Sequence, residues 1–66
     1  MTTRFSEGHY QSTHGRAPRG RGMWAFEMTT PEGPQTRFYN GTYTEARNQA
    51  MREARANGWT AVTVMP

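Results

Sequence analysis

The side chains best suited to chemistry in this sequence are its arginines. All eight basic residues are arginine and all five acidic residues are glutamate. A guanidinium group presents a planar fork of N–H donors that matches phosphate oxygens, so an arginine without a carboxylate partner is suited to bind a phosphate group. The residues that we predict to contact nucleic acid are Arg16, Arg19, Arg21, Arg37, Tyr39, Arg52 and Arg55.

The first 22 residues hold the excess positive charge. They contain four arginines and one glutamate, whereas the remaining residues contain four of each, so the formal net charge of +3 lies in this segment. Apart from the initial methionine, Phe5 and Tyr10 are its only large apolar side chains, too few to offset the entropy of ordering the backbone. We predict that residues 1–21 form a disordered arm that follows a nucleic-acid backbone, with a solubilising tail as the alternative.

A helix is predicted from about Tyr43 to Asn57, with Thr42 as its N-cap. Thr42 and Glu45 have the spacing of a capping box, in which the hydroxyl and the carboxylate each accept a hydrogen bond from a backbone N–H of the first turn. The residues between the ends are rich in alanine, arginine and glutamate and include no proline or glycine. Gly58 then supplies a left-handed C-cap.

The predicted helix has an apolar side and a basic side. At 100° per residue, the apolar side contains Tyr43, Ala46, Ala50, Ala54 and Asn57, with Arg47 and Met51 on its flank. Its alanines allow close packing on a sheet. The opposite side carries Asn48, Arg52 and Arg55, and neither arginine has a glutamate three or four residues away. This stripe either faces an anion or is a solvated outer face.

Two strands are predicted before the helix. Residues 23–29 alternate so that Trp24, Phe26 and Met28 face the core, and residues 35–39 form a second strand with Phe38 facing the core. We expect Arg37 and Tyr39 on the opposite face. The segment Thr30-Pro31-Glu32-Gly33-Pro34 is typical of a hairpin loop of about five residues, and Asn40-Gly41 of a tight turn.

A third strand is predicted at residues 59–65, with Val62 and Val64 facing the core. The expected fold is therefore α+β, a small ββαβ domain at residues 22–66 after the arm of residues 1–21. A right-handed crossover gives a three-stranded, mainly antiparallel sheet of order 2-1-3, covered on one face by one helix. The open face would carry apolar side chains able to bind a partner, namely Met23, Ala25, Tyr39 and Met65.

Catalysis and cofactor binding are not predicted. The sequence has no cysteine and no aspartate, and its glutamates are not paired by pattern for acid and base roles. His9 and His14 are five residues apart without a neighbouring thiolate, which does not favour a metal site. No apolar run is long enough to cross a membrane and the N-terminus lacks the features of a signal peptide, so we expect a cytoplasmic protein.

Residues 22–56 resemble the small DNA-binding modules of AP2-type proteins and of the arm-binding end of tyrosine recombinases. The similarity lies in G-M-W-A-F-E from Gly22, a turn at Gly33, the basic strand Thr36-Arg37-Phe38, and N-G-T-Y-T-E-A-R from Asn40. The resemblance implies that the sheet enters the major groove, with Arg37 reaching a base or a phosphate and the arm following the adjacent backbone. The predicted strand after the helix departs from these modules.

Two hypotheses of function follow from the sequence. The first is a small nucleic-acid-binding module with a basic arm, for which DNA is favoured over RNA. The second is a protein-interaction or regulatory module that uses the open sheet face, as a homodimer or with a protein partner. The two are compatible, because a dimer with two basic arms binds nucleic acid more tightly through avidity.

Overall fold

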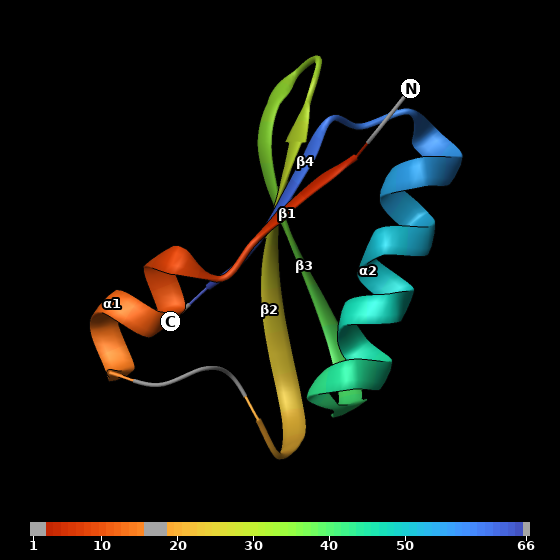
Figure 1. Cartoon of the computed structure of the whole chain (residues 1–66). Helices are drawn as coiled ribbons and strands as arrows, with labels where there is room; N and C mark the ends of the chain where they lie inside the picture. Colours follow the sequence, from red (N-terminus) through yellow and green to blue (C-terminus); the bar gives the residue numbers. More distant parts are fainter. Residues whose placement is uncertain (1–2, 16–18, 66) are drawn as a thin grey trace.

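The protein is a small α+β domain built on one mixed sheet of four strands (Figure 1). The computed structural model describes residues 3–15 and 19–65, and residues 1–2, 16–18 and 66 lie outside the described part. The sheet has the order β1-β4-β2-β3, in which β1 is parallel to β4 and the other pairs are antiparallel. The elements are β1 (Arg4–Ser6), α1 (Gly8–His14), β2 (Arg21–Thr30), β3 (Gly33–Thr42), α2 (Tyr43–Asn57) and β4 (Ala61–Val64).

The helix predicted from the capping pattern is confirmed as α2. Thr42 Oγ1 accepts a hydrogen bond from the Glu45 backbone N–H at 3.1 Å, and Glu45 Oε1 accepts one from the Thr42 N–H at 2.9 Å. Gly58 ends the helix with a φ of 72°, in the left-handed region that glycine adopts at little steric cost. Local sequence signals therefore determine both ends of α2.

The core lies between α2 and one face of the sheet. Phe26 and Met28 of β2 and Val64 of β4 are fully buried, as the alternation of apolar residues predicted. Three alanines complete the helix side of this core, and their small side chains allow the helix backbone to lie close to the strands. These alanines are Ala46, Ala50 and Ala54, all with no exposed surface.

The predicted strand order is retained, with one addition. The order β3-β2-β4 is the predicted 2-1-3 arrangement, and β1 pairs in parallel with the free edge of β4.

The prediction of a disordered arm is wrong for part of its length, because residues 3–15 contain β1 and α1. Two large apolar side chains are enough to order this segment because each packs against the rest of the domain. The ring centroids of Phe5 and Phe26 are 6.3 Å apart, and those of Tyr10 and Trp24 are 5.9 Å apart.

The hairpin between β2 and β3 is tighter than the sequence indicated. Pairing continues to Thr30 and Gly33, so the loop is the dipeptide Pro31-Glu32 and not five residues. Thr30 stabilises it, since its Oγ1 donates to the Gly33 carbonyl at 2.6 Å and accepts from the Glu32 N–H at 3.2 Å. Asn40-Gly41 is likewise not a turn, because both residues pair with β2 inside the ladder.

The prediction for which side chains of β3 face the core was also wrong. Phe38 pairs with Ala25 on the face away from α2 and is 64% exposed, whereas Tyr39 pairs with Trp24 on the helix side. Side chains alternate along a strand, so a difference of one residue moves every side chain of β3 to the other face. Arg37 and Tyr39 consequently lie on the α2 side of the sheet.

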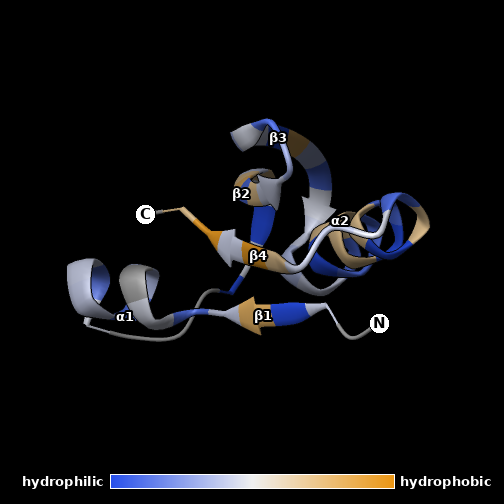
Figure 2. Ribbon diagram, turned by 90° about the horizontal axis from the view of Figure 1, so that it is seen from above, coloured by the Kyte–Doolittle hydropathy of each residue, from blue (hydrophilic) through white to orange (hydrophobic). Residues whose placement is uncertain are grey.

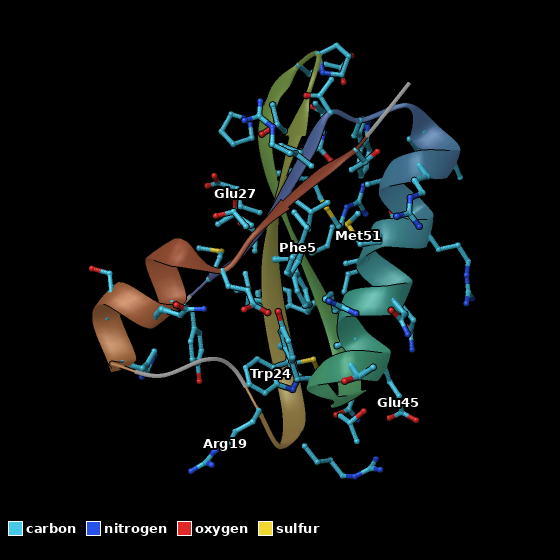
Figure 3. The ribbon with its side chains drawn as sticks, in the orientation of Figure 1. Phe5, Arg19, Trp24, Glu27, Glu45 and Met51 are labelled. Carbon is cyan, nitrogen blue, oxygen red and sulfur yellow. The ribbon has the colours of Figure 1, made fainter. Side chains whose placement is uncertain are left out.

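The two faces of the sheet differ in character. Viewed from above, α2 lies along one side of the strands (Figure 2). Figure 3 shows Phe5 and Met51 in the region between sheet and helix, and Glu27 on the other side. On that second face, which we name the open face, Met23 and Phe38 are 66% and 64% exposed.

Candidate nucleic-acid interface

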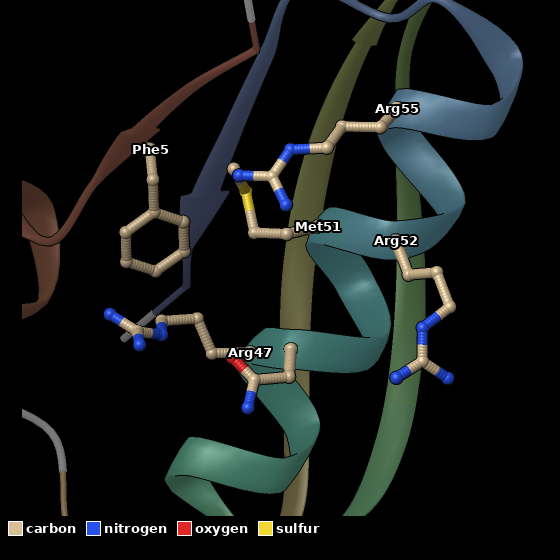
Figure 4. A pocket seen from close by; sticks show the side chains of 6 residues that line it. Phe5, Arg47, Met51, Arg52 and Arg55 are labelled. Carbon is tan, nitrogen blue, oxygen red and sulfur yellow. The ribbon is translucent and has the colours of Figure 1, made fainter.

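A basic hollow lies between β1 and α2. Its volume is about 560 Å³, comparable to that of a small-molecule site, and we name it the arginine hollow (Figure 4). It is lined by Phe5, Arg47, Asn48, Met51, Arg52 and Arg55. Five of these six residues come from α2, so one helix positions all of the polar side chains that line the hollow.

The hollow exists because β1 is an edge strand that lies at the side of α2. The helix packs on β2, β3 and β4, and β1 pairs beyond β4. The side chain of Phe5 points to the same sheet face as its partner Val62, and its ring is half-buried. The ring therefore forms part of the wall opposite the arginines of α2.

Hydrogen bonds on both sides of Phe5 hold β1 in place. Thr3 Oγ1 donates to the Trp59 carbonyl at 2.8 Å, and the Arg4 N–H donates to the Thr60 carbonyl at 2.8 Å. Glu7 then accepts from the hydroxyl of Tyr43, in the first turn of α2, at 2.6 Å. Burial, followed by this bond, raises the pKa of Tyr43, so the phenol remains a donor.

The arginines approach the hollow from successive turns of α2. Arg47, Met51 and Arg55 are four residues apart and lie along one side of the helix. In Figure 4, the guanidinium groups of Arg47 and Arg55 extend toward Phe5, whereas Arg52 lies further round the helix. The Cζ atom of Arg47 lies 5.7 Å from the centroid of the Phe5 ring, within cation–π range.

No carboxylate lines the hollow in the described part of the chain. Arg47, Arg52 and Arg55 form no ion pair within 4.0 Å with a described residue. The two glutamates of α2 are bound elsewhere: Glu45 in the capping box and Glu53 by β3. The positive charges of the hollow are therefore not neutralised from within their own helix.

On the β3 side of α2, by contrast, an arginine is paired with a carboxylate. Glu53 accepts a hydrogen bond from the Tyr39 hydroxyl and lies 3.8 Å from Arg37 Nε. Arg37 also lies over the ring of Trp59, 5.7 Å from its centroid. We name these four residues the Glu53 cluster. Burial raises the pKa of Tyr39, and the bond to Glu53 adds to that effect.

The predicted site residues thus divide into separate groups. Arg52 and Arg55 lie in the arginine hollow, whereas Arg37 and Tyr39 belong to the Glu53 cluster and not to the open face. Arg19 and Arg21 are exposed near the start of α2, where the Gly20 carbonyl accepts from the Tyr43 N–H at 2.8 Å. Arg16 lies outside the described residues. Of the predicted partner interface, Met23, Ala25 and Met65 lie on the open face and Tyr39 does not.

The sequence interpretation missed half of the hollow. The sequence pattern places Phe5 in the arm, and Met51 and Arg47 on the flank of the apolar side of the helix. A signal for Arg47 was present, since it stands four residues before Met51 and eight before Arg55. Nothing in the sequence pattern places Phe5 beside them, because its position depends on the pairing of β1 with the distant strand β4.

Other kinds of site are not supported by the described residues. They include no cluster of three histidines or acidic residues able to hold a metal ion. His14 stacks on Tyr10 with a centroid distance of 4.2 Å, and the side chain of His9 lies outside the described part. None of the helices described is long and apolar enough to cross a membrane.

Comparison with known proteins adds no relative. The chain matches no protein-family model, and neither the curated proteins nor the solved structures give a significant match. The resemblance of residues 22–56 to AP2-type and recombinase modules therefore stays a prediction. The function must be inferred from the geometry of the chain itself.

Proposed function

We propose that this protein is a small nucleic-acid-binding module that holds the phosphate backbone in the arginine hollow. The observation that carries the proposal is that Arg47, Arg52 and Arg55 line one hollow whose described lining includes no carboxylate. Guanidinium groups are weakly hydrated and bind phosphate through two parallel hydrogen bonds, so such a group of arginines favours a phosphate polymer.

The asparagine of the hollow fits the same interpretation. Asn48 places a neutral amide beside the arginines, and an amide both donates to phosphate oxygens and accepts from base amino groups. The overall charge of +3 and the exposed Arg19 and Arg21 would add non-specific attraction to any phosphate backbone, and DNA is the first polymer to test.

The test compares two variants of equal charge. In the first, Arg47, Arg52 and Arg55 are changed to glutamine; in the second, the exposed N-terminal arginines Arg4, Arg19 and Arg21 are changed instead. Each lowers the net charge by the same amount. Affinity for labelled DNA, as duplex and as single strand, is measured over a range of salt concentrations.

We expect the hollow variant to lose most of the affinity. If each of its arginines neutralises one phosphate, the slope of log K against log salt falls in magnitude by about 2 for a single strand and about 3 for a duplex. The N-terminal variant should lose only the general attraction of net charge. The opposite ranking would place binding in the N-terminal segment and reject the hollow as the site.

A second function is favoured by a different surface. Met23 and Phe38 are exposed on the open face, and a 66-residue chain buries only a small core, so covering this face would add stability. The face also carries Arg4 on β1 and Glu27 on β2, so a two-fold pairing can set opposite charges against each other. The occupant proposed is a second copy of this chain.

Sedimentation of Phe38→Glu against the unchanged protein tests this second function. The substitution should convert a dimer to a monomer, because it buries an unpaired charge at the centre of the face. Asn48→Glu adds the same charge on α2 and should leave the mass unchanged. If the unchanged protein is already monomeric at high concentration, the proposal of a second copy is wrong. An assembly that then forms only with another protein would indicate a different partner.

A further inference from the structure

We propose that the arginine hollow takes an unpaired nucleotide of a single strand, with its base on Phe5 and its phosphates on Arg47 and Arg55. This inference rests on the proposed function and specifies which form of nucleic acid is bound. It follows from one feature that phosphate binding does not require, namely an aromatic ring in the wall of a basic hollow.

The ring of Phe5 is placed for stacking. It is half-buried, and its contact with Phe26, at 6.3 Å between centroids, fixes it from the core side. The guanidinium of Arg47 lies over the ring, 5.7 Å from its centroid. Stacked planes lie closer than this, so an entering base would take the place over the ring and leave Arg47 free for the adjoining phosphate.

The hollow does not suit an intact duplex in the same way. Bases in a duplex are stacked on both sides and offer only their edges in the grooves. The faces that an aromatic ring can bind are exposed in single strands, in which the bases are not paired. A duplex would reach the arginines with its phosphates alone and would leave Phe5 without a role.

The apolar part of the hollow agrees with a base-sized ligand. Met51 separates Arg47 from Arg55 along the helix, and its side chain extends from the same side of the helix as theirs (Figure 4). Thioether and aromatic groups together form an apolar wall about which the cations are arranged. A free phosphate ion would use the cations only, whereas a nucleotide would use both parts.

Two aromatic substitutions test the inference. Phe5→Leu removes the ring from the hollow, and Phe38→Leu makes the same change on the open face, where the ring is 64% exposed. Fluorescence anisotropy of one labelled DNA oligonucleotide, alone and annealed to its complement, gives the two affinities at one salt concentration. Phe5→Tyr serves as the conservative variant.

We expect the unchanged protein to prefer the single strand. Phe5→Leu should weaken single-strand binding about tenfold and change duplex binding little, while Phe5→Tyr and Phe38→Leu retain the preference. Equal affinities for both forms in the unchanged protein, or loss of the preference with Phe38→Leu alone, would overturn the inference. Should Phe5→Leu fail to fold, ring-current shifts of the Phe5 protons on titration decide the question in the unchanged protein.

The outcomes separate the two proposals. If binding is abolished by the arginine substitutions but does not distinguish single strand from duplex, the proposed function stands and the stacking inference fails. If the arginine substitutions leave binding unchanged, both fail together.

Discussion

Arginine plays opposite parts on the two sides of α2. On the β3 side, Arg37 is matched by the carboxylate of Glu53 and covers the ring of Trp59. On the β1 side, Arg47 and Arg55 extend toward Phe5, and no described carboxylate lines the space between them. The residue type is the same on both sides, and an aromatic ring is present on both.

The difference lies in where the glutamates point. The segment from residue 23 onward has a net charge of zero, which would predict no basic surface there. Its glutamates are nevertheless placed away from the hollow: Glu53 toward β3, Glu45 in the helix cap, Glu27 on the open face and Glu32 in the loop between β2 and β3. Local potential depends on this arrangement and not on the sum of charges.

Placing a carboxylate in the hollow should remove the difference between the two sides. Asn48→Glu puts a glutamate four residues before Arg52, the order in which such pairs stabilise a helix by about 0.3 kcal/mol. The same charge would repel phosphate, so we expect nucleic-acid affinity to fall about tenfold. Thermal unfolding and the salt-dependent titration measure the two effects, which should have opposite signs.

Thr36→Glu is the matched control for this prediction. Thr36 is exposed on the opposite side of the sheet, so the variant has the same net charge and leaves the hollow intact. Equal loss of affinity in both variants would mean that only net charge matters and that the arginine hollow is not a site.

Loosening the Glu53 cluster should instead affect stability alone. Tyr39→Phe removes the hydroxyl that donates to Glu53 and should lower the free energy of unfolding by about 1 kcal/mol, since the carboxylate is partly exposed and recovers water. Nucleic-acid affinity should not change. Chemical denaturation and titration of the same sample give both values.

Tyr10→Phe provides the comparison for that change. The Tyr10 hydroxyl forms no hydrogen bond with a described side chain, so its removal should leave stability nearly unchanged. If both variants lose the same stability, the Tyr39 bond contributes nothing specific. If Tyr39→Phe lowers affinity without unfolding the protein, the Glu53 cluster belongs to the binding surface.

The features that the sequence predicted correctly are those determined by local signals. The capping pair Thr42 and Glu45, the alanine side and Gly58 act within one or two turns, and α2 was predicted with its observed bounds. The core positions of β2 and β4 followed equally from alternation. The stripe of Arg52 and Arg55 was found for the same reason, because helical spacing alone determines it.

The features that were missed depend on distant pairing. The register of β3 is set by the hairpin at Pro31-Glu32, and a shorter loop than expected placed Phe38 outward. The strand β1 exists because residues 4–6 complete the edge of β4, a partner near the other end of the chain. The place of Phe5 opposite the arginines depends on this pairing. The sequence could therefore predict the arginines Arg52 and Arg55 but not the hollow.

Glu45 and Arg21 form a third pair, intermediate between these two cases. Their side chains are 58% and 72% exposed and lie 4.0 Å apart, so water screens the ion pair. The pKa of Glu45 is lowered chiefly by the hydrogen bond from the Thr42 backbone N–H, with Arg21 as a minor cause. The Glu45 carboxylate therefore interacts mainly with the N-terminus of α2 and only weakly with Arg21.

The consequence is a small dependence of stability on pH. A lowered pKa in the folded state means that the contribution of Glu45 is present above its ordinary value of 4.5 and is lost as pH falls through the folded value. Thermal unfolding across this range should show the loss in the unchanged protein and in Arg21→Gln, but not in Glu45→Gln. If Arg21→Gln removes the dependence, the ion pair and not the cap binds the carboxylate, and an exposed arginine can be neutralised as fully as Arg37 is.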